Sequence, residues 1–323
     1  MTRDSIPLDR PDAELRLALA CMAYALTALL YSRHDFAVLA HQYAVSHFYV
    51  LPPMTIAGLS AAAVLARPAA PLGYIRDILQ RRGLGAAMTL LVFCLGVTAF
   101  STFKHHLPAW VPFFADPPLA DLDEALHFGP PWRWTHAVTP PGAAGLLGFL
   151  YGPVWFAQFF GFVLFAAFLT RDRLRIRYLI ALAGTLILLG TLGRIAGASA
   201  GPIFFDRMQG GARFADLATC LAATRPGAAM LAASDYLYAS YRSDTAVFGS
   251  GISAMPSIHV AIATLNALFL RALNPQLAPI GAIFAASILF GSVYFGWHYA
   301  LDGYASILGV ALIWWGAGRL ARP

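Results

Sequence analysis

Long uncharged apolar stretches, separated by short polar segments, run through most of this chain. A helix needs about 20 apolar residues to cross the hydrocarbon core of a bilayer, and no alternation of apolar and polar positions indicates strands. The second stretch is the weakest, because Pro52 and Pro53 interrupt it. The pattern predicts an all-α, polytopic membrane bundle of about eight transmembrane helices, at residues 15–32, 44–66, 84–103, 143–169, 177–199, 254–272, 277–297 and 299–319.

The composition agrees with a membrane protein. Hydrophobic residues make up 59% of the 323 positions and charged residues only 12%, about half of the charged fraction of a soluble domain. The net charge of +6 is attributed to loop arginines that set topology, so nucleic-acid binding is not expected. The N-terminus carries mixed charge without a small-residue cleavage site, so no signal peptide is predicted. The three cysteines have neither zinc spacing nor a disulfide pattern.

The basic residues divide unevenly between alternate loops. The larger set lies in short loops close to the ends of the predicted spans, where positive charge counts most for orientation. This asymmetry predicts an integral protein of the inner or plasma membrane with both termini in the cytoplasm. The larger set comprises Arg3, Arg10, Arg16, Arg67, Arg76, Arg81, Arg82, Arg171, Arg173, Arg175, Arg177, Arg271, Arg319 and Arg322, and the smaller set Arg33, Lys104, Arg133, Arg194, Arg207, Arg213, Arg225 and Arg242.

Two long loops are expected on the non-cytoplasmic face. Residues 104–142 are rich in proline and aromatic residues, and their tryptophans suit the headgroup layer. Residues 200–252 contain short helical patterns, such as 226–240. This second loop is predicted either to cover a site or to be a passive connection, because long loops are only often functional.

The pair His298 and Asp302 is the first candidate for chemistry. Their i, i+4 spacing predicts that both side chains lie on one face of a helix. A carboxylate in that position fixes the imidazole tautomer and leaves the other ring nitrogen free as a nucleophile or base. The alternative is a structural pair near the membrane interface, although ionisable groups at membrane depth favour a function.

A second candidate lies in the segment Ser253–His259, which reads SAMPSIH. Pro256 is expected in the first turn of a helix, where free backbone N–H groups form an anion site. Ser257 would add a hydroxyl donor, and His259, one turn into the helix, would face the same pocket and protonate a leaving oxygen. The alternative is a capped helix with an interfacial histidine.

Together the two candidates resemble the second and third motifs of the type 2 phosphatidic acid phosphatase superfamily, P-S-x-H and S-R-x5-H-x3-D. Here the motifs stand as Pro256–His259 and as Gly291, Ser292, His298 and Asp302, separated by one helical hairpin. The resemblance implies a six-helix phosphatase-type catalytic domain over 84–323, after N-terminal transmembrane helices in 1–83. It implies that His298 forms a phosphohistidine, that Asp302 orients it and that His259 is the general acid.

The chain departs from that family pattern at two positions. Ser292 stands where the third motif has arginine. The first motif, K-x6-R-P, is matched only by Arg194 in place of the lysine and by Pro202, while Gly201 replaces the arginine. Arg194 is predicted either to bind phosphate or to extend to the membrane surface as a topological anchor.

The degenerate motifs are similar to those of the inositol phosphorylceramide synthase branch. Lys104, the only lysine, precedes a proline-rich segment and Asp116 as in that branch, and would act either as an extra phosphate ligand or as an interfacial anchor. The resemblance implies transfer of a headgroup such as phosphoinositol from a phospholipid to a lipid hydroxyl, in sphingolipid metabolism. The alternatives are a lipid phosphate or prenyl diphosphate phosphatase with water as acceptor, and a non-enzymatic transporter.

The remaining histidines raise the question of a metal site. Four of them fall in the 104–142 loop near several acids, but no H-E-x-x-H or comparable spacing occurs, and the implied chemistry needs neither metal nor cofactor. His34, His41 and His47, around the second span, are expected in the headgroup layer. The four loop histidines are His105, His106, His127 and His136, and the acids are Asp116, Asp121, Asp123 and Glu124.

Overall fold

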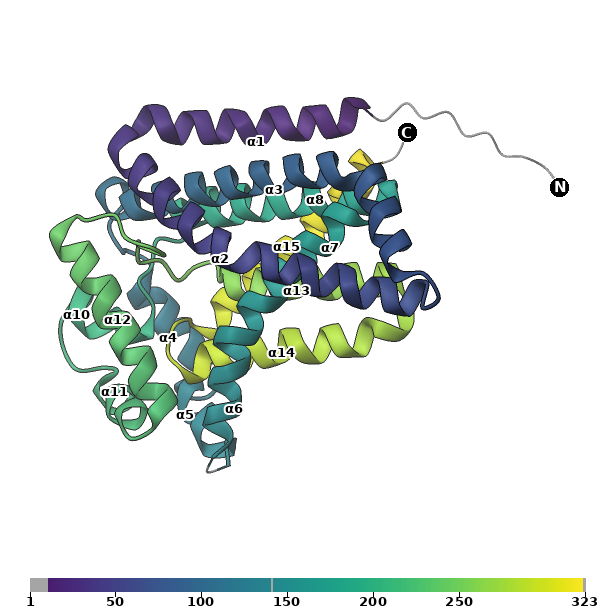
Figure 1. The fold of residues 1–323 in the computed structure, drawn as a ribbon. Helices are drawn as coiled ribbons and strands as arrows, with labels where there is room; N and C mark the ends of the chain where they lie inside the picture. The colour runs from purple at the N-terminus through teal and green to yellow at the C-terminus, as the bar shows by residue number, and fades with distance from the viewer. Residues whose placement is uncertain (1–10, 141, 322–323) are drawn as a thin grey trace.

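Membrane-length helices lying side by side form the body of the protein (Figure 1). The computed structural model describes residues 11–140 and 142–321, and within these ranges every regular element is a helix. In this described part of the chain, seven helical segments are long and apolar enough to cross a membrane, which confirms the predicted polytopic bundle. The helices of the bundle are α1 (Pro11–Tyr31), α2 (Arg33–Ala66), α3 (Pro71–Trp110), α7 (Trp155–Phe168), α8 (Asp172–Gly184), α13 (Ile258–Leu273), α14 (Ala278–Tyr294) and α15 (Ala300–Leu320). Helix α13 is shorter than a span and is not among the seven.

Helix α2 is longer than expected and is not broken by its prolines. It begins at Arg33, eleven residues before the predicted start, and continues through Pro52 and Pro53 to Ala66. Proline is tolerated inside membrane helices because neighbouring groups satisfy the freed carbonyls. Just beyond the prolines, the Thr55 hydroxyl donates to the Leu51 carbonyl over 2.7 Å.

Helix α3 also exceeds its predicted span at both ends. Pro71 occupies its first turn, and the charged residues that follow are good helix formers although they are too polar for an apolar window. Its last turns run on to Trp110, so Lys104 lies in a helix and the following connection begins only at Val111. The domain division proposed at residue 84 falls inside this helix and stays a prediction.

Two of the membrane segments contain π-helical turns. The first joins α6 (Ala143–Phe149) to α7 through η1 (Leu150–Val154), and the second joins α8 to α9 (Arg194–Ala196) through η2 (Thr185–Gly193). Such wide turns occur frequently at functional sites. Here they carry Tyr151 and lead directly into Arg194.

Helix α13 is the centre of the core. It begins at Ile258, four residues after the predicted start, because Ser257 is its N-cap. With 16 residues it is about 24 Å long, shorter than α14 and α15. Its segment from Val260 to Leu265 is nearly all inaccessible to solvent, packed in one continuous cluster with side chains from α7, α8, α14 and α15. Helix α13 is therefore held on all sides.

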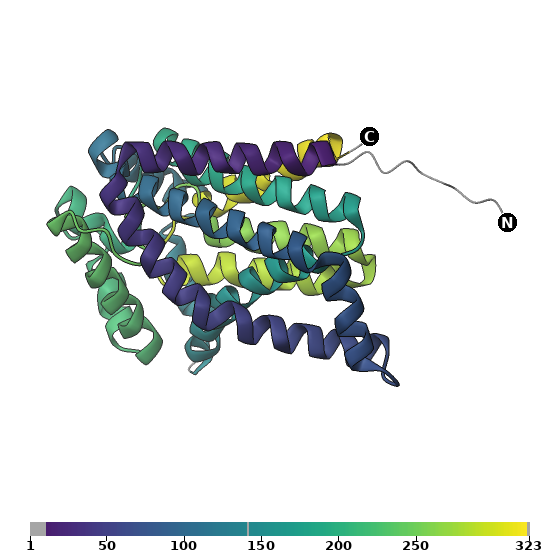
Figure 2. The same cartoon turned by 45° about the horizontal axis from the view of Figure 1, so that its top comes forward.

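Short helices gather at one end of the bundle, where α13 and α15 begin. Helices α10, α11 and α12 stand outside the bundle in both views, and α4 and α5 fill the space beside them (Figures 1 and 2). We call these five helices the cap. The expected pattern at 226–240 is confirmed within α12. The cap helices are α4 (Asp116–Leu126), α5 (Pro131–Val138), α10 (Pro202–Gln209), α11 (Ala215–Ala222) and α12 (Arg225–Ser243).

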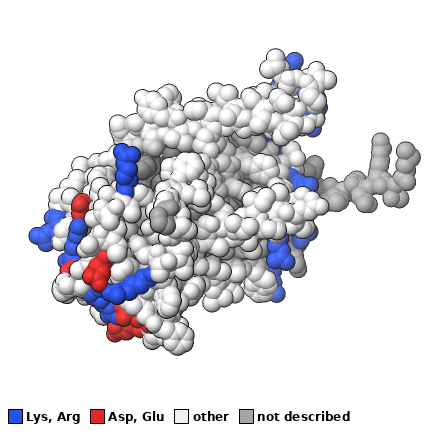
Figure 3. Space-filling view, turned by 90° about the horizontal axis from the view of Figure 1, so that it is seen from below, with Lys and Arg blue, Asp and Glu red and all other residues white. Residues whose placement is uncertain are grey.

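Charged side chains concentrate at the two ends of the molecule. Seen from below, basic and acidic side chains cluster at the capped end, basic ones appear at the opposite end, and the face between them is nearly free of both (Figure 3). Helix α1 begins and α15 ends opposite the cap (Figure 1). This distribution fits a bundle whose middle lies in hydrocarbon.

Candidate active site

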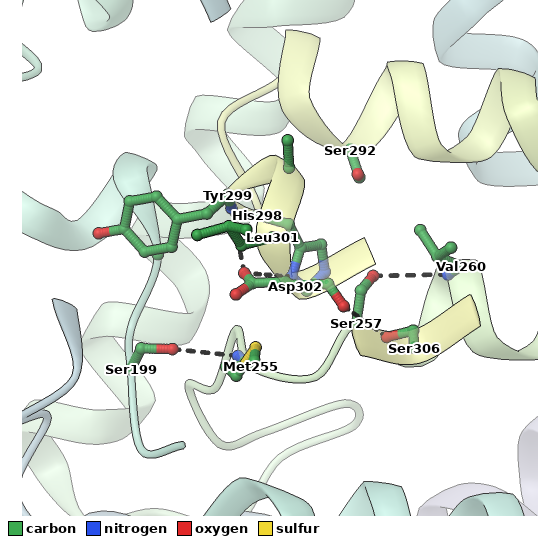
Figure 4. A network of polar contacts seen from close by, with 12 residues as sticks. Ser199, Met255, Ser257, Val260, Ser292, His298, Tyr299, Leu301, Asp302 and Ser306 are labelled. Atoms are coloured by element: carbon green, nitrogen blue, oxygen red, sulfur yellow. Dashed lines mark hydrogen bonds and ion pairs between the residues drawn. The ribbon is translucent and has the colours of Figure 1, made fainter. Parts of the chain in front are cut away.

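His298 and Asp302 meet at the start of α15. His298 lies in the connection before the helix, and its backbone N–H donates to the Ser292 carbonyl over 3.2 Å. Asp302, in the first turn of α15, places Oδ2 3.3 Å from His298 Nδ1 and 3.0 Å from the Tyr299 backbone N–H (Figure 4). The predicted pairing is confirmed, but the shared helix face was wrong, because the carboxylate reaches back across the N-terminus instead.

This arrangement leaves one nitrogen of His298 available. Burial lowers the pKa of His298 to about 3, with the positive charges of Arg194 and Lys104 acting in the same direction and a hydrogen bond to the Ala254 backbone opposing them. The imidazole is therefore neutral near pH 7. Its proton belongs on Nδ1, which faces the buried carboxylate, so that Nε2 carries the free lone pair.

His259 is the second residue of α13, not one turn into the helix as expected, since the helix begins at Ile258. Its ring stacks against Tyr151 and Trp155, with centroids 4.9 Å and 4.1 Å away. The Trp155 indole N–H also donates to the His259 carbonyl over 2.9 Å. The π-helical turn and α7 thus fix the orientation of this imidazole.

Pro256 and Ser257 act differently from the prediction. Pro256 precedes the N-cap and is not in the first turn. The Ser257 side chain accepts from the Val260 N–H over 3.4 Å (Figure 4), so it caps the helix by satisfying one of the free N–H groups that were expected to bind an anion. Neither residue is among those that line the adjacent cavity.

A cavity of about 400 Å³ contains both catalytic candidates. His259 and His298 line it, together with the cationic side chains of Lys104 and Arg194. The wall then follows α7 away from the cap and becomes aromatic. The aromatic residues of that wall are Trp155, Phe156, Phe159 and Phe160.

Arg194 is a buried cation in this cavity. Its side chain is only 4% exposed, and Nε and Nη1 have no hydrogen-bond partner among the residues that the structure describes. The guanidinium lies over the Phe100 ring, 4.7 Å from its centroid. It does not extend to the membrane surface. Because an uncompensated buried charge is costly, the position suits a residue that receives an anion.

Lys104 points into the same cavity from α3. Its ammonium group donates to the Gly249 carbonyl over 3.1 Å. Gly251 packs against the Lys104 backbone with φ +91°, and a Cβ at that position would lie 2.4 Å from the Lys104 carbonyl oxygen. The loop 249–253 thus covers the lysine closely, which argues against an anchor in the headgroup layer.

Comparison with known proteins places this geometry in a family. Residues 117–316, more than half of the chain, match the model of the PAP2 superfamily. The chain belongs to the PAP2 superfamily. No curated protein and no solved structure gives a significant match. The matched region includes Arg194, His259, His298 and Asp302, whereas Lys104 and the helices α1 and α2 precede it.

Neither of the two positions where this chain lacks a motif arginine lines the cavity. The Ser292 hydroxyl is buried and donates to the Leu289 carbonyl over 2.7 Å, and Ser292 does not line the cavity. Gly201 has φ +95°, and a Cβ there would approach the Trp297 carbonyl oxygen to 2.5 Å. An arginine at position 201 does not fit this backbone, so Arg194 and Lys104 supply the cationic wall.

Two acids of α4 position the site, and the sequence analysis missed this role. Asp116 accepts from the N–H groups of Ala200 and Gly201 over 2.7 and 2.9 Å and from the Tyr299 hydroxyl over 2.9 Å. Burial raises its pKa, while these backbone hydrogen bonds oppose the rise. Asp123 accepts from the first two N–H groups of α15 over 3.0 and 3.1 Å. Their spacing of seven residues, two helical turns, is the signal that indicates a shared buried face.

The suspected metal ligands of the 104–142 segment are dispersed. His127 contacts the Asp123 carbonyl and the Tyr304 hydroxyl, and His136 stacks on Tyr294 at 4.0 Å. His105 and His106 instead join Asp35 of α2, with their ligand atoms within 4.8 Å of one another. None of the three lines the cavity. His47, expected in the headgroup layer, is buried and does line it.

Proposed function

We propose that this protein is a membrane-embedded lipid phosphotransferase that works through a phosphohistidine on His298. One observation carries the proposal: a single cavity joins an oriented histidine, the buried cation Arg194 and the partly buried cation Lys104 to an aromatic wall that continues into the membrane body. Such a space suits a molecule with an anionic head and apolar chains. Membership of the PAP2 superfamily supports phosphatase-type chemistry in general.

The first step attaches the phosphoryl group to the enzyme. His298 Nε2 attacks phosphorus and forms an N–P bond while the bond from phosphorus to the leaving oxygen breaks. His259 enters this step as the imidazolium, donates its proton to that oxygen and becomes neutral. Arg194 and Lys104 stabilise the charge on the non-bridging oxygens in a site of low dielectric, and Asp302 stabilises the positive charge that develops on the imidazole.

The second step releases the group to an acceptor. The acceptor hydroxyl attacks phosphorus, its proton passes to His259 and the N–P bond breaks. His298 is 7% exposed, and the loop 249–253 and the cap lie over it. Limited access of water supports a lipid hydroxyl as the acceptor. Water in the same place would give a lipid phosphate or prenyl diphosphate phosphatase, which is the alternative.

The number of cations favours a phosphodiester substrate. Ser292 and Gly201 replace two arginines of the family motifs, which leaves Arg194 and Lys104 in the cavity wall. A phosphodiester carries one negative charge and a monoester up to two, so a diester needs fewer cationic ligands. A phospholipid headgroup donor such as phosphatidylinositol, with a ceramide-like acceptor, fits this count.

We further propose that the cap faces the non-cytoplasmic side. Those arginines of the larger set that lie in the described residues, such as Arg76, Arg173 and Arg319, are found toward the end opposite the cap, and the positive-inside rule assigns such an end to the cytoplasm. A transporter, the alternative of another class, is disfavoured because its binding groups are expected near mid-membrane between structural repeats, whereas the cavity's charged groups lie under the cap.

Transfer from labelled lipids tests the proposal. Purified protein in lipid is given phosphatidylinositol labelled with ³²P, with and without ceramide, beside labelled phosphatidic acid and prenyl diphosphate. We expect label in a new lipid only when the acceptor is present, and no turnover by His298→Ala or His259→Ala. Release of inorganic phosphate alone would support the phosphatase. Turnover that survives in both variants would contradict the mechanism.

A further inference from the structure

His47 is a buried histidine that the chemistry above leaves unused. It lies on α2, is 4% exposed, and neither ring nitrogen has a hydrogen-bond partner among the described residues. It lines the same cavity as His298. A polar group buried without a partner costs free energy, and within a bilayer there is no water to replace one. A ligand that supplies the partner removes this cost.

The position of His47 along the cavity follows from its contacts. Helices α2 and α3 run antiparallel, so residues later in α2 meet residues earlier in α3. Tyr43 hydrogen-bonds Ser101 over 2.7 Å, whereas the ring of His47 packs 6.2 Å from that of Phe93, eight residues earlier in α3. One helical turn, about 6 Å, separates Tyr43 from His47. His47 therefore lies farther from the cap than the Tyr43–Ser101 pair.

The cavity wall thus has three levels. Lys104 is nearest the cap, one turn beyond Ser101 on the same helix. The Tyr43–Ser101 pair comes next, and His47 with Phe160, 5.3 Å between ring centroids, is the deepest. From the cap inward, the cavity wall is first charged, then neutral and polar, and finally aromatic. A lipid that carries polar linkages between its phosphate and its chains has the same order of chemistry.

We propose that His47, beside the Tyr43–Ser101 pair, forms a second subsite that binds the carbonyl of an acyl-linked lipid while its phosphate lies at His298. The inference rests on the proposed function and narrows its substrate class. A neutral imidazole has one N–H donor, and ester and amide linkages offer a carbonyl a few bonds beyond the phosphate. Glycerophospholipids and ceramide-type lipids have that group, whereas prenyl phosphates do not.

This subsite also assigns a role to the helices that precede the family match. Tyr43 and His47 belong to α2, and the matched region begins only at residue 117. His259, His298 and Arg194 come from the matched region, and α2 closes the side of the cavity that receives the lipid backbone. His41 lies on the same helix but is exposed, which makes it a matched control.

Binding of ester-linked and ether-linked phosphatidic acid with equal chains tests the subsite. Both lipids are titrated onto full-length protein carrying His298→Asn, which removes turnover, and tryptophan fluorescence reports binding because Trp155 and Trp297 line the cavity. We expect the ester to bind about tenfold more tightly, the worth of one good hydrogen bond. His47→Phe is expected to remove this preference by weakening the ester alone. His47→Gln, which retains an N–H donor, is expected to keep part of it, and His41→Phe all of it.

The outcomes separate this inference from the proposed function. If His47→Phe weakened the binding of both lipids equally, His47 would have a packing role and the subsite would be overturned. So would an unchanged preference in that variant, or no preference before substitution. Conversely, an ester preference that depends on His47, in a protein whose wild type turns over no lipid, would uphold the subsite and contradict the proposed transferase.

Discussion

Arg194 is the residue whose environment most clearly indicates that a ligand binds beside it. Its guanidinium is buried against Phe100 without a hydrogen bond from Nε or Nη1 to the described part of the chain. A cation placed in this way lowers the stability of the empty protein and becomes favourable only when an anion arrives. Stability and activity should therefore respond in opposite directions when the charge is removed.

Arg194→Gln tests this opposition. Removal of one charge-stabilising group typically costs about 10²-fold in rate, so we expect kcat/KM for lipid substrate to fall by that order. The melting temperature should stay equal or rise, because a buried charge is lost. Arg207→Gln, which breaks an exposed ion pair with Asp235, should change neither. A lower melting temperature in Arg194→Gln would indicate a structural role instead.

The motif residues were predictable from the sequence because their spacing is local, whereas their supports were not. His259, His298 and Asp302 were identified from two short patterns. Asp116 holds the 199–201 loop, and Asp123 holds the start of α15. Their partners Ala200 and Ala300 lie 84 and 177 residues away in the sequence. The seven-residue spacing of the two acids indicates a shared buried face, but their partners are set by tertiary packing and cannot be read from a local pattern.

At the scale of elements, the connection 197–201 determines which phosphate ligands the chain can carry. Asp116 fixes its backbone, and Gly201 turns it beneath the Trp297 carbonyl with a positive φ. Only glycine fits that close approach. An arginine at this position would therefore require a different local backbone.

Gly201→Ala tests this close approach, with Gly210→Ala as its control. Both glycines have φ near +90° and ψ near 170°, so alanine suffers a similar backbone penalty at each. A Cβ at Gly210 meets no atom within 4 Å, whereas at Gly201 it meets the Trp297 carbonyl. We expect Gly201→Ala to lower the free energy of unfolding by about 2 kcal/mol more than Gly210→Ala. Equal losses in chemical denaturation would contradict this explanation.

Apolar length located the membrane helices, since hydrocarbon thickness dictates it. It did not locate their ends. Helices α2 and α3 continue through polar or proline-containing turns at Arg33, Pro52 and Lys104, where capping, helix propensity and neighbouring helices decide. For this reason Lys104 was predicted in a loop, whereas it lies on α3 and faces the cavity.

At the scale of the whole molecule, the membrane helices run back and forth between two ends. One end carries the cap, and at the opposite end α1 begins and α15 ends. The capped end holds the cavity's charged groups. The opposite end holds those arginines of the larger set that the structure describes. If positive charge sets the orientation as proposed, the phosphoryl chemistry takes place on the non-cytoplasmic side.

Cys220 provides a natural probe of that orientation. It is exposed on α11 in the cap, whereas Cys21 and Cys94 lie partly buried in membrane helices. We expect a membrane-impermeant maleimide to label intact cells through Cys220, and Cys220→Ser to lose the label. In that background Gln80→Cys, exposed at the opposite end, should react only after lysis. Labelling of Gln80→Cys in intact cells would reverse the proposed topology.

The central claim is that phosphorus is held covalently by His298 during transfer. Rapid quenching of a single turnover with ³²P-labelled phospholipid tests it most directly. We predict protein-bound label that is stable in alkali, labile in acid and confined to the peptide containing His298, and we predict neither label nor turnover in His298→Asn. Turnover by His298→Asn within tenfold of the wild type, or wild-type turnover in which the label never resides on the protein, would contradict the account.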